Sequence, residues 1–215
     1  MTFRLSLAAR RITIAAVAAL GTASAAGTIA STASASSSCA SLEKAYANRN
    51  VAKLTLAHRE RTAWCVVNDA RRQNGAPALK DVSTLRTSAL RHAVRSVTLR
   101  WWSLTDGLAS HVDPSQAGMT PSAAIAQRIA AAGYCQTGTP TTNENTFSAW
   151  GNGQFPATIQ GAVNWWLHDP PHRATLLSTA YRSVGVGMRP ASAFPQDTGG
   201  AQAITVVADF GTCAT

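Results

Sequence analysis

The first 35 residues determine the compartment in which the rest of the chain has to fold. Residues 1–11 carry three arginines and no acid, residues 12–20 form an apolar run, and A-x-A sites follow at 23–25 and 33–35. A basic start, a short apolar run and a small-residue exit are typical of a secretory signal peptide. The run is too short to span a bilayer as a helix. We therefore predict a signal peptide over 1–35, cleaved after Ala25 or Ala35, and an exported protein that is extracellular or associated with the cell envelope.

Export would place the four cysteines of the chain in an oxidising compartment. Cys39, Cys65, Cys135 and Cys213 include no C-x-x-C pair and no zinc-finger spacing, so disulfides are the favoured interpretation. Four cysteines allow three pairings. We favour Cys39–Cys65, which would tie the N-terminal segment to the first helix, and Cys135–Cys213, which would tie the end of the chain to a loop.

The basic charge of the chain is unevenly distributed. The formal net charge of +9 falls to +6 when residues 1–35 are removed. Residues 36–100 hold 12 Lys/Arg and four acids, whereas residues 101–215 hold four arginines and six acids. No aromatic-plus-basic motif or helix-turn-helix pattern accompanies the basic half, so we predict no nucleic-acid partner. In an exported protein that is not an integral membrane protein, this charge suits an anionic envelope polymer or lipid headgroups. Nothing in the sequence indicates an oligomeric state.

Helical patterns precede strand patterns along the chain. Helices are predicted over 52–73, from a cap at Asp81 to residue 97, from 121 to a glycine stop at 133, and from 155 or 156 to 168, with one more turn over 173–177. Strands are predicted over 183–188 and 204–210, as an antiparallel pair. No element is predicted for the Gly-, Thr-, Pro- and Asn-rich segment 136–145. This order indicates an α+β domain over 54–215, preceded by a Ser-rich linker and N-terminal segment over 36–53 that Cys39 holds.

Four polar residues near the ends of these elements offer chemistry. They are His111, Glu144, Asp169 and His172. Two imidazoles and two carboxylates are suited to a transition-metal site or to acid–base catalysis. Each residue also has a structural interpretation, as a hydrogen-bonded histidine or as an acid in a turn. The chain contains no G-x-S-x-G or H-E-x-x-H motif, so the sequence gives a hydrolase no independent support.

Taken in order, the motifs of this chain resemble those of the CAP superfamily, the secreted domain shared by cysteine-rich secretory proteins, venom antigens and plant pathogenesis-related proteins. The resemblance is strongest to its bacterial branch of SCP-like extracellular proteins, and it covers about residues 54–213. The matching motifs are Asn68-Asp69-Ala70-Arg71, Gly75-Ala76-Pro77-Ala78-Leu79, Ser110-His111, Gly133-Tyr134, Glu144-Asn145, Trp166-x-x-Asp169-Pro170-x-His172-Arg173, Val184-Gly185-Val186-Gly187 and Asp209-Phe210-Gly211.

The resemblance implies an α-β-α sandwich, with a small antiparallel sheet between helices and a shared cleft. In some relatives paired histidines bind a divalent metal, zinc above all, which implies His111, His172 and Glu144 as the metal-binding residues here. Asp169 stands where many eukaryotic members have a glutamate. It would supply a fourth ligand or cap the turn before Pro170.

Three functions follow from this resemblance as expectations. The first is a secreted, non-enzymatic domain that binds a ligand or a weakly held divalent metal in the cleft, at or near the cell envelope. The second is a metal-assisted hydrolase in which Glu144 acts as base and His172 is required for turnover. The third is a lipid or sterol carrier with an aromatic groove. The aromatic residues that would line this groove are Tyr134, Trp101, Trp102 and Trp150.

Overall fold

The computed structural model describes residues 38–151 and 153–214. The predicted signal peptide over 1–35 and its two candidate cleavage sites lie outside the described residues. Residues 38–46 are helical, and a short 3-10 helix, η1 (Val51–Lys53), follows them. Within the described part of the chain, no helix has the length and apolar character needed to cross a bilayer.

The remaining elements alternate between helices and strands. The helices are α2 (Leu56–Gln73), α3 (Ser83–Leu99), α4 (Pro121–Ala131), α5 (Ile159–His168) and α6 (Pro170–Leu177), with short 3-10 helices η2 (Gly107–His111) and η3 (Pro114–Gln116) between α3 and α4. The strands are β1 (Lys80–Asp81), β2 (Thr139–Trp150), β3 (Ser183–Arg189) and β4 (Ala203–Ala214).

The sheet has the strand order β1-β3-β4-β2, so β2 forms one edge. Strands β3 and β4 are antiparallel, as predicted, and β2 pairs antiparallel with β4 along its whole length. The two-residue strand β1 pairs in parallel with β3, which makes the sheet mixed. Strand β2 has no counterpart in the sequence prediction, because its Asn- and Pro-containing sequence has weak strand propensity. Pairing with the apolar strand β4 overrides that local preference.

Four helix starts differ from the prediction. Helix α5 begins at Ile159 and not at 155 or 156, and α6 begins at Pro170 and not at 173. The helix expected over 52–73 begins at Leu56, because Thr55 Oγ1 accepts a hydrogen bond from the backbone of His58 and caps it there. Asp81 does not cap α3. Its backbone pairs with β3 in the sheet, and its carboxylate accepts a hydrogen bond from Arg86.

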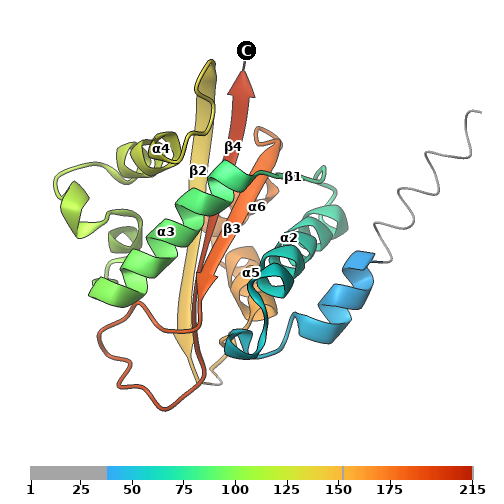
Figure 1. The fold of residues 1–215 in the computed structure, drawn as a ribbon, viewed down its shortest axis with the longest axis vertical. Helices are drawn as coiled ribbons and strands as arrows, with labels where there is room; N and C mark the ends of the chain where they lie inside the picture. The colour runs from blue at the N-terminus through green and yellow to red at the C-terminus, as the bar shows by residue number, and fades with distance from the viewer. Residues whose placement is uncertain (1–37, 152, 215) are drawn as a thin grey trace, which may run out of the picture. The chain divides into compact units, whose positions relative to one another are not determined.

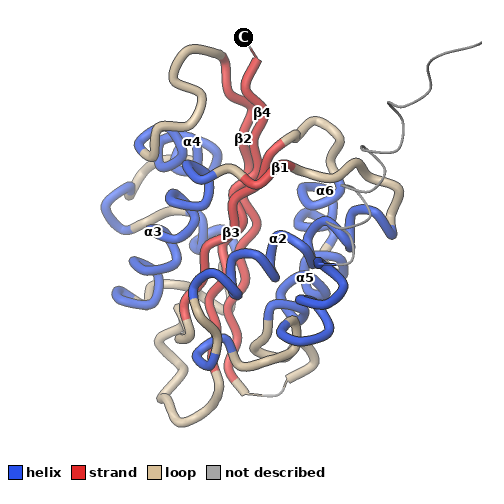
Figure 2. Tube along the Cα trace, turned by 45° about the vertical axis from the view of Figure 1, so that its right-hand side comes forward, coloured by secondary structure: helices blue, strands red, loops and turns tan. Residues whose placement is uncertain are grey.

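Helices cover both faces of the sheet. Helices α3 and α4 contact one face, and α2, α5 and α6 contact the other. Figure 2 shows the strands as a central layer between these two groups. The predicted α+β class and the α-β-α sandwich are therefore confirmed.

Close packing of α3 on β3 depends on two glycines. A Cβ added at Gly185 would lie 2.0 Å from the backbone nitrogen of Arg86, and one added at Gly187 would lie 2.1 Å from that of Leu90. Any side chain at either position would push α3 off the sheet. The glycines in this strand therefore set the spacing between the helix and the sheet.

Both favoured disulfides are present. Cys39 bonds to Cys65 on α2, and Cys135, which follows α4, bonds to Cys213 near the end of β4. The second bond joins residues 78 positions apart, next to the start of β2.

Candidate functional site

The site is built around the edge strand β2. Side chains alternate between the two faces of a strand, so Glu144 lies on the α3/α4 face while its neighbours lie on the α5/α6 face. Asn143 Nδ2 donates to Thr175 Oγ1 at 3.1 Å, and Asn145 Nδ2 donates to the backbone carbonyl of His172 at 2.9 Å. Strand β2 therefore contacts side chains of both helical layers, and these side chains lie around the edge of the sheet that β2 forms.

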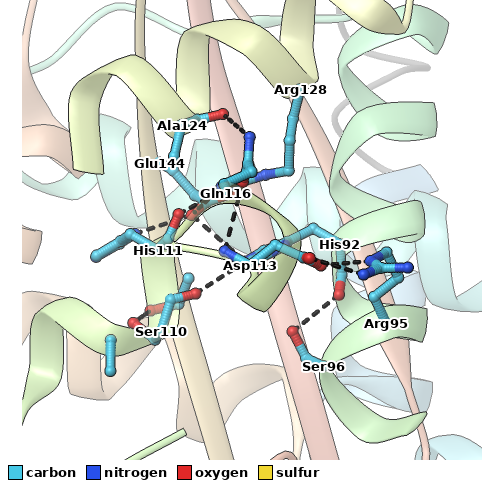
Figure 3. A network of polar contacts seen from close by, with 12 residues as sticks. His92, Arg95, Ser96, Ser110, His111, Asp113, Gln116, Ala124, Arg128 and Glu144 are labelled. Atoms are coloured by element: carbon cyan, nitrogen blue, oxygen red, sulfur yellow. Dashed lines mark hydrogen bonds and ion pairs between the residues drawn. The ribbon is translucent and has the colours of Figure 1, made fainter. Parts of the chain in front are cut away.

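The carboxylate of Glu144 is completely buried and fully engaged (Figure 3). Arg128 Nη2 donates to Glu144 Oε1 at 3.0 Å and to Oε2 at 2.8 Å. His111 Nδ1 lies 2.8 Å from Oε1. A carboxylate can only accept, so His111 Nδ1 is the donor in this contact, and Nε2 is the ring nitrogen that Glu144 does not engage.

Arg128 also fixes the loop that carries His111. Its Nη1 donates to the backbone carbonyl of His111 and to Gln116 Oε1, both at 2.8 Å. Asp113, between these two residues, forms an ion pair with Arg95 on α3. Hydrogen bonding from Arg95 outweighs burial and holds the pKa of Asp113 well below its usual range. The loop between α3 and α4 is thus tied to both helices that flank it.

The charge of Glu144 depends on Arg128 and His111. Burial raises the pKa of Glu144, but the charge of Arg128 and the hydrogen bond to His111 outweigh it and hold the pKa well below its ordinary value. His92 Nε2 lies 3.8 Å from Glu144 Oε1 and 2.8 Å from the carbonyl oxygen of Ser110, to which it donates. Burial lowers the pKa of His92, and Arg128 and His111 lower it further. The cluster therefore contains an ionised glutamate and a neutral His92.

His172 lies at the start of α6 and is oriented by Asp169. Asp169 is the N-cap of α6, and its Oδ2 accepts from the backbone nitrogen of His172 at 3.4 Å and lies 2.6 Å from His172 Nδ1. Of the two expectations for Asp169, the structure shows the cap. Burial lowers the pKa of His172, and Asp169 opposes that shift. His172 is therefore neutral at neutral pH, with its proton on Nδ1.

The two histidines face one cleft. Their ring centroids are 6.3 Å apart and their planes are inclined by 30°. A cavity of about 580 Å³ is lined by both rings, by Glu144 and Asp169, and by apolar residues that include Trp165. Among the described residues neither Nε2 has a hydrogen-bond partner, and His172 Nε2 is buried. The structure thus brings together all four residues that the sequence singled out.

The residues of this cleft that could hold a divalent metal are His111 and His172, through their Nε2 atoms. Two imidazoles on one tetrahedral zinc, with Zn–N bonds of about 2.0–2.1 Å, have ring centroids about 5 Å apart. The observed pair would need to approach by about 1 Å. In the described part of the chain, the only three His, Cys or acid ligand atoms grouped within 4.8 Å belong to Cys39, Glu43 and Cys65, whose sulfurs form a disulfide. Glu144 and Asp169 lie behind the histidines, in the orienting position that carboxylates often take at metal sites.

Sequence reasoning missed three members of the cluster: His92, Arg128 and Asp209. Each is a polar residue within an apolar pattern: His92 on the buried stripe of α3, Arg128 three residues after Ile125 on α4, and Asp209 inside the apolar strand β4. A polar residue inside an apolar pattern was the sequence signal that could have identified these three residues. Asp209 is fully buried and pairs with Glu144 across β2 and β4. Burial, together with the charge of Glu144, raises the pKa of Asp209 well above its ordinary value.

The four predicted groove aromatics separate into two groups. Trp102 and Trp150 line a second cavity of about 440 Å³ together with Phe155, Trp165 and Phe194. Tyr134 instead packs in a small core with Leu85, Ile125 and Ile129, and Trp101 Nε1 donates to the carbonyl of Ala109. The second cavity shares Gly107, Trp165 and His172 with the histidine cleft, so the two cavities are neighbours.

The chain is similar to several solved structures and matches one protein family. A search of curated proteins gave no significant match. Among solved structures, the chain is similar to an outer surface protein from Borrelia burgdorferi (23% identity, TM-score 0.48, 70% of this chain and 90% of that one). It is also similar to an SCP-domain extracellular protein from Bacillus anthracis (16% identity, TM-score 0.49, 73% of this chain and 43% of that one). A third similar structure is a cysteine-rich secretory protein from Staphylococcus aureus (17% identity, TM-score 0.43, 72% of this chain and 38% of that one). The chain spans less than half the length of these last two proteins. The profile of the cysteine-rich secretory protein family, CAP, matches residues 65–210, from the first helix to the last strand. The chain therefore belongs to the CAP family.

Proposed function

We propose that this chain is an exported CAP-domain protein that binds a ligand at or near the cell envelope through a divalent metal, zinc first, held by His111 and His172. The observation that carries this proposal is that a carboxylate orients each of the two histidines in the same way. Each has its Nδ1 against a carboxylate oxygen, at 2.8 Å from Glu144 and 2.6 Å from Asp169, both residues line the same cleft, and neither Nε2 has a hydrogen-bond partner among the described residues. Neutral imidazoles oriented in this way are good zinc ligands, and water or the bound ligand would complete the coordination.

The environment of Glu144 favours binding over hydrolysis. A general base works best with a pKa near the operating pH and with a free oxygen facing the substrate. The pKa of Glu144 is held well below its ordinary value, and Arg128 and His111 occupy both of its oxygens. Glu144 is therefore better suited to orient His111 than to activate water.

Zinc calorimetry near neutral pH tests the metal site. We expect a measurable isotherm for the exported protein and none for the His111→Ala/His172→Ala double variant. His58→Ala is the matched control, because this imidazole stacks on Tyr46 outside the cleft. The affinity should fall as the pH drops through the imidazole range, since a protonated histidine cannot coordinate. Equal affinity in the wild type and the double variant would contradict the proposal.

A carrier of an apolar ligand is a second candidate, favoured by the second cavity. Its hydroxyl groups already bond within the protein: Ser110 Oγ pairs with Thr146 Oγ1, and Ser148 Oγ pairs with Thr205 Oγ1. The cavity therefore offers mainly aromatic surface to a ligand. Native mass spectrometry of the exported protein should detect a co-purified lipid, and an empty protein would count against this candidate.

A further inference from the structure

Strand β2 leaves one edge of the sheet without a partner strand. It is last in the strand order, and within the described residues no strand lies beyond it (Figure 1). Its pairing with β4 has no bulge, so the backbone groups of successive residues face β4 and the open edge in turn. Just past the paired residues, Gly151 N donates at 2.8 Å to the carbonyl of Gln202, which places the odd-numbered residues toward β4. On β4, the carbonyl of Gly211 accepts from Arg182 N beside β3, which agrees with the same alternation.

The even-numbered residues of β2 therefore turn their backbone groups to the open edge. Two of these groups are occupied by side chains: Glu144 N donates to Asn143 Oδ1, and the carbonyl of Thr146 accepts from Trp166 Nε1. In the part of the chain that the structure describes, the N–H groups of Thr146 and Ser148 and the carbonyl of Ser148 have no hydrogen-bond partner. A strand added at this edge would bond to these three groups.

The second cavity lies along this edge. It is lined by five successive residues of β2, 146–150, whose side chains alternate between the two faces of the sheet. One cavity can contact residues of both faces only where the sheet ends, so this cavity follows the edge of β2. At a rise of about 3.4 Å per residue the stretch is about 14 Å long, which is enough for about five residues of an extended chain.

Aromatic side chains form the two walls of this cavity. Trp102 and Phe194 lie on the side of α3, in edge contact with ring centroids 6.0 Å apart. Phe155 and Trp165 lie on the side of α5, with centroids 5.3 Å apart. Trp102 is buried, and its Nε1 has no hydrogen-bond partner among the described residues. No acid, lysine or arginine of the described chain lines the cavity, so the residues of a ligand that enter it must be uncharged.

The combination of a free strand edge and two aromatic walls favours a peptide over a lipid. In an extended peptide the backbone can bond to the edge while successive side chains point alternately to the two walls. A lipid chain would contact the walls, but it would leave the N–H groups of Thr146 and Ser148 without a partner in a site from which it displaces water.

We propose that the edge of β2 at residues 146–150 binds an extended peptide of about five uncharged, mainly apolar residues, which adds to the sheet as a further strand. The peptide backbone bonds to the N–H groups of Thr146 and Ser148 and to the Ser148 carbonyl. Its side chains contact the two aromatic walls in turn. This binding uses no metal, so it is independent of the histidine site.

Fluorescence anisotropy of a labelled heptapeptide, Lys-Val-Leu-Thr-Leu-Val-Lys, tests the proposal on the exported protein. We expect saturable binding with an equal affinity in the presence and absence of EDTA. Methylation of all five central amide nitrogens should weaken binding at least about tenfold, because the side chains remain but the backbone can no longer donate. Methylation of alternate amides leaves one edge of the peptide free to pair, so its affinity should stay within about threefold.

A protein variant tests the walls separately. Phe155→Ala should weaken peptide binding at least about tenfold, because it removes most of one wall. Tyr46→Ala is the matched control, since this half-buried aromatic ring packs against the same core but stacks on His58 outside the cavity. Melting temperatures of the two variants show whether both remain folded.

Three results would overturn the proposal. They are no saturable binding of the heptapeptide up to about 1 mM, equal binding of the fully methylated peptide, and equal losses in Phe155→Ala and Tyr46→Ala. Binding of palmitate in place of the peptide would assign the cavity to the lipid carrier. A dimer in light scattering, together with no peptide binding, would mean that a second copy of the chain pairs with this edge. Because the peptide is titrated in EDTA, its binding and the zinc isotherm can each fail without the other.

Discussion

Removing the Arg128 side chain should expose how strongly the buried cluster depends on one cation. Arg128→Met keeps the length and much of the apolar stem of the side chain, but it removes every donor to Glu144 from α4. The carboxylate is then left with His111 as its remaining hydrogen-bond partner. Glu144 has no solvent exposure to replace the lost donors, whereas the Arg128 side chain is 12% exposed.

The expected cost is about 3–5 kcal/mol of unfolding free energy, the range for breaking a buried ion pair from one side. The two further hydrogen bonds that Arg128 makes, to the His111 carbonyl and to Gln116, come from a charged donor and contribute about 1.5–3 kcal/mol each, so they place the cost toward the upper end of this range. Glu144→Gln should cost less, because the arginine that it leaves unpaired can reach water. The Arg128→Met/Glu144→Gln double variant should be more stable than Arg128→Met alone, with a coupling of about 2 kcal/mol.

Urea denaturation followed by tryptophan fluorescence measures these differences, with the exposed Arg49→Met as control. The pH adds an independent check. The folded pKa of wild-type Glu144 is depressed, so its contribution is complete above the ordinary value of 4.5 and declines as the pH falls below it. In Arg128→Met burial acts without its counter-charge, so the stability gap should be widest at neutral pH and narrow in acid. A cost below about 1 kcal/mol, or a double variant equal to the sum of the single variants, would refute this account of the cluster.

Three further predictions concern stability. Asp209→Asn should stabilise the protein at pH 7, because the folded pKa of this acid is raised and its ionised form is unfavourable in the folded state. The gain in unfolding free energy should shrink as the pH falls toward 3.8, where the acid is protonated in both states. A gain that does not change with pH in chemical denaturation would contradict this. In the chain-entropy model, replacing the Cys135–Cys213 pair by alanines should cost about 4.5 kcal/mol of unfolding free energy, because it opens a loop of 78 residues. Replacing Cys39–Cys65 opens a loop of 26 residues and should cost about 3.5 kcal/mol. A lower melting temperature for the Cys39–Cys65 variant than for the Cys135–Cys213 variant would contradict this order. Gly187→Ala should cost about 3 kcal/mol or more, because the new Cβ would meet the Leu90 backbone at 2.1 Å, and a neutral change in calorimetry would show that α3 can move away.

Local sequence features were enough to predict most of the helices. Thr120 and Pro121 give α4 its start, and Asp169 with the two prolines after it separates α5 from α6, as the sequence indicated. These features act within a few residues, so they can be recognised without the fold. The start of α3 could not be located in this way, because whether Asp81 caps a helix or pairs in a sheet depends on strand β3, about a hundred residues later.

The sequence predicted the four polar residues that line the cleft and missed the three residues that surround Glu144. His111, Glu144, Asp169 and His172 were recognised through a resemblance, and the structure brings them to one cleft. Strand β2 was missed because its stability comes from pairing with β4 and not from its own composition. Arg128 was missed for a related reason, since only the folded sheet places Glu144 beneath α4.

The alternation of side chains along β2 makes the cleft dependent on strand register. A shift of one residue against β4 would turn Glu144 toward α6, so the His111 imidazole would lose its carboxylate, and Asn145 would move away from the His172 carbonyl. The Cys135–Cys213 bond closes beside the Pro140–Cys213 pair, so it fixes that register covalently. A reduced precursor would contain every residue of the cleft without this constraint. Oxidation of this pair would then restrict slippage of β2 against β4 and hold Glu144 beneath α4.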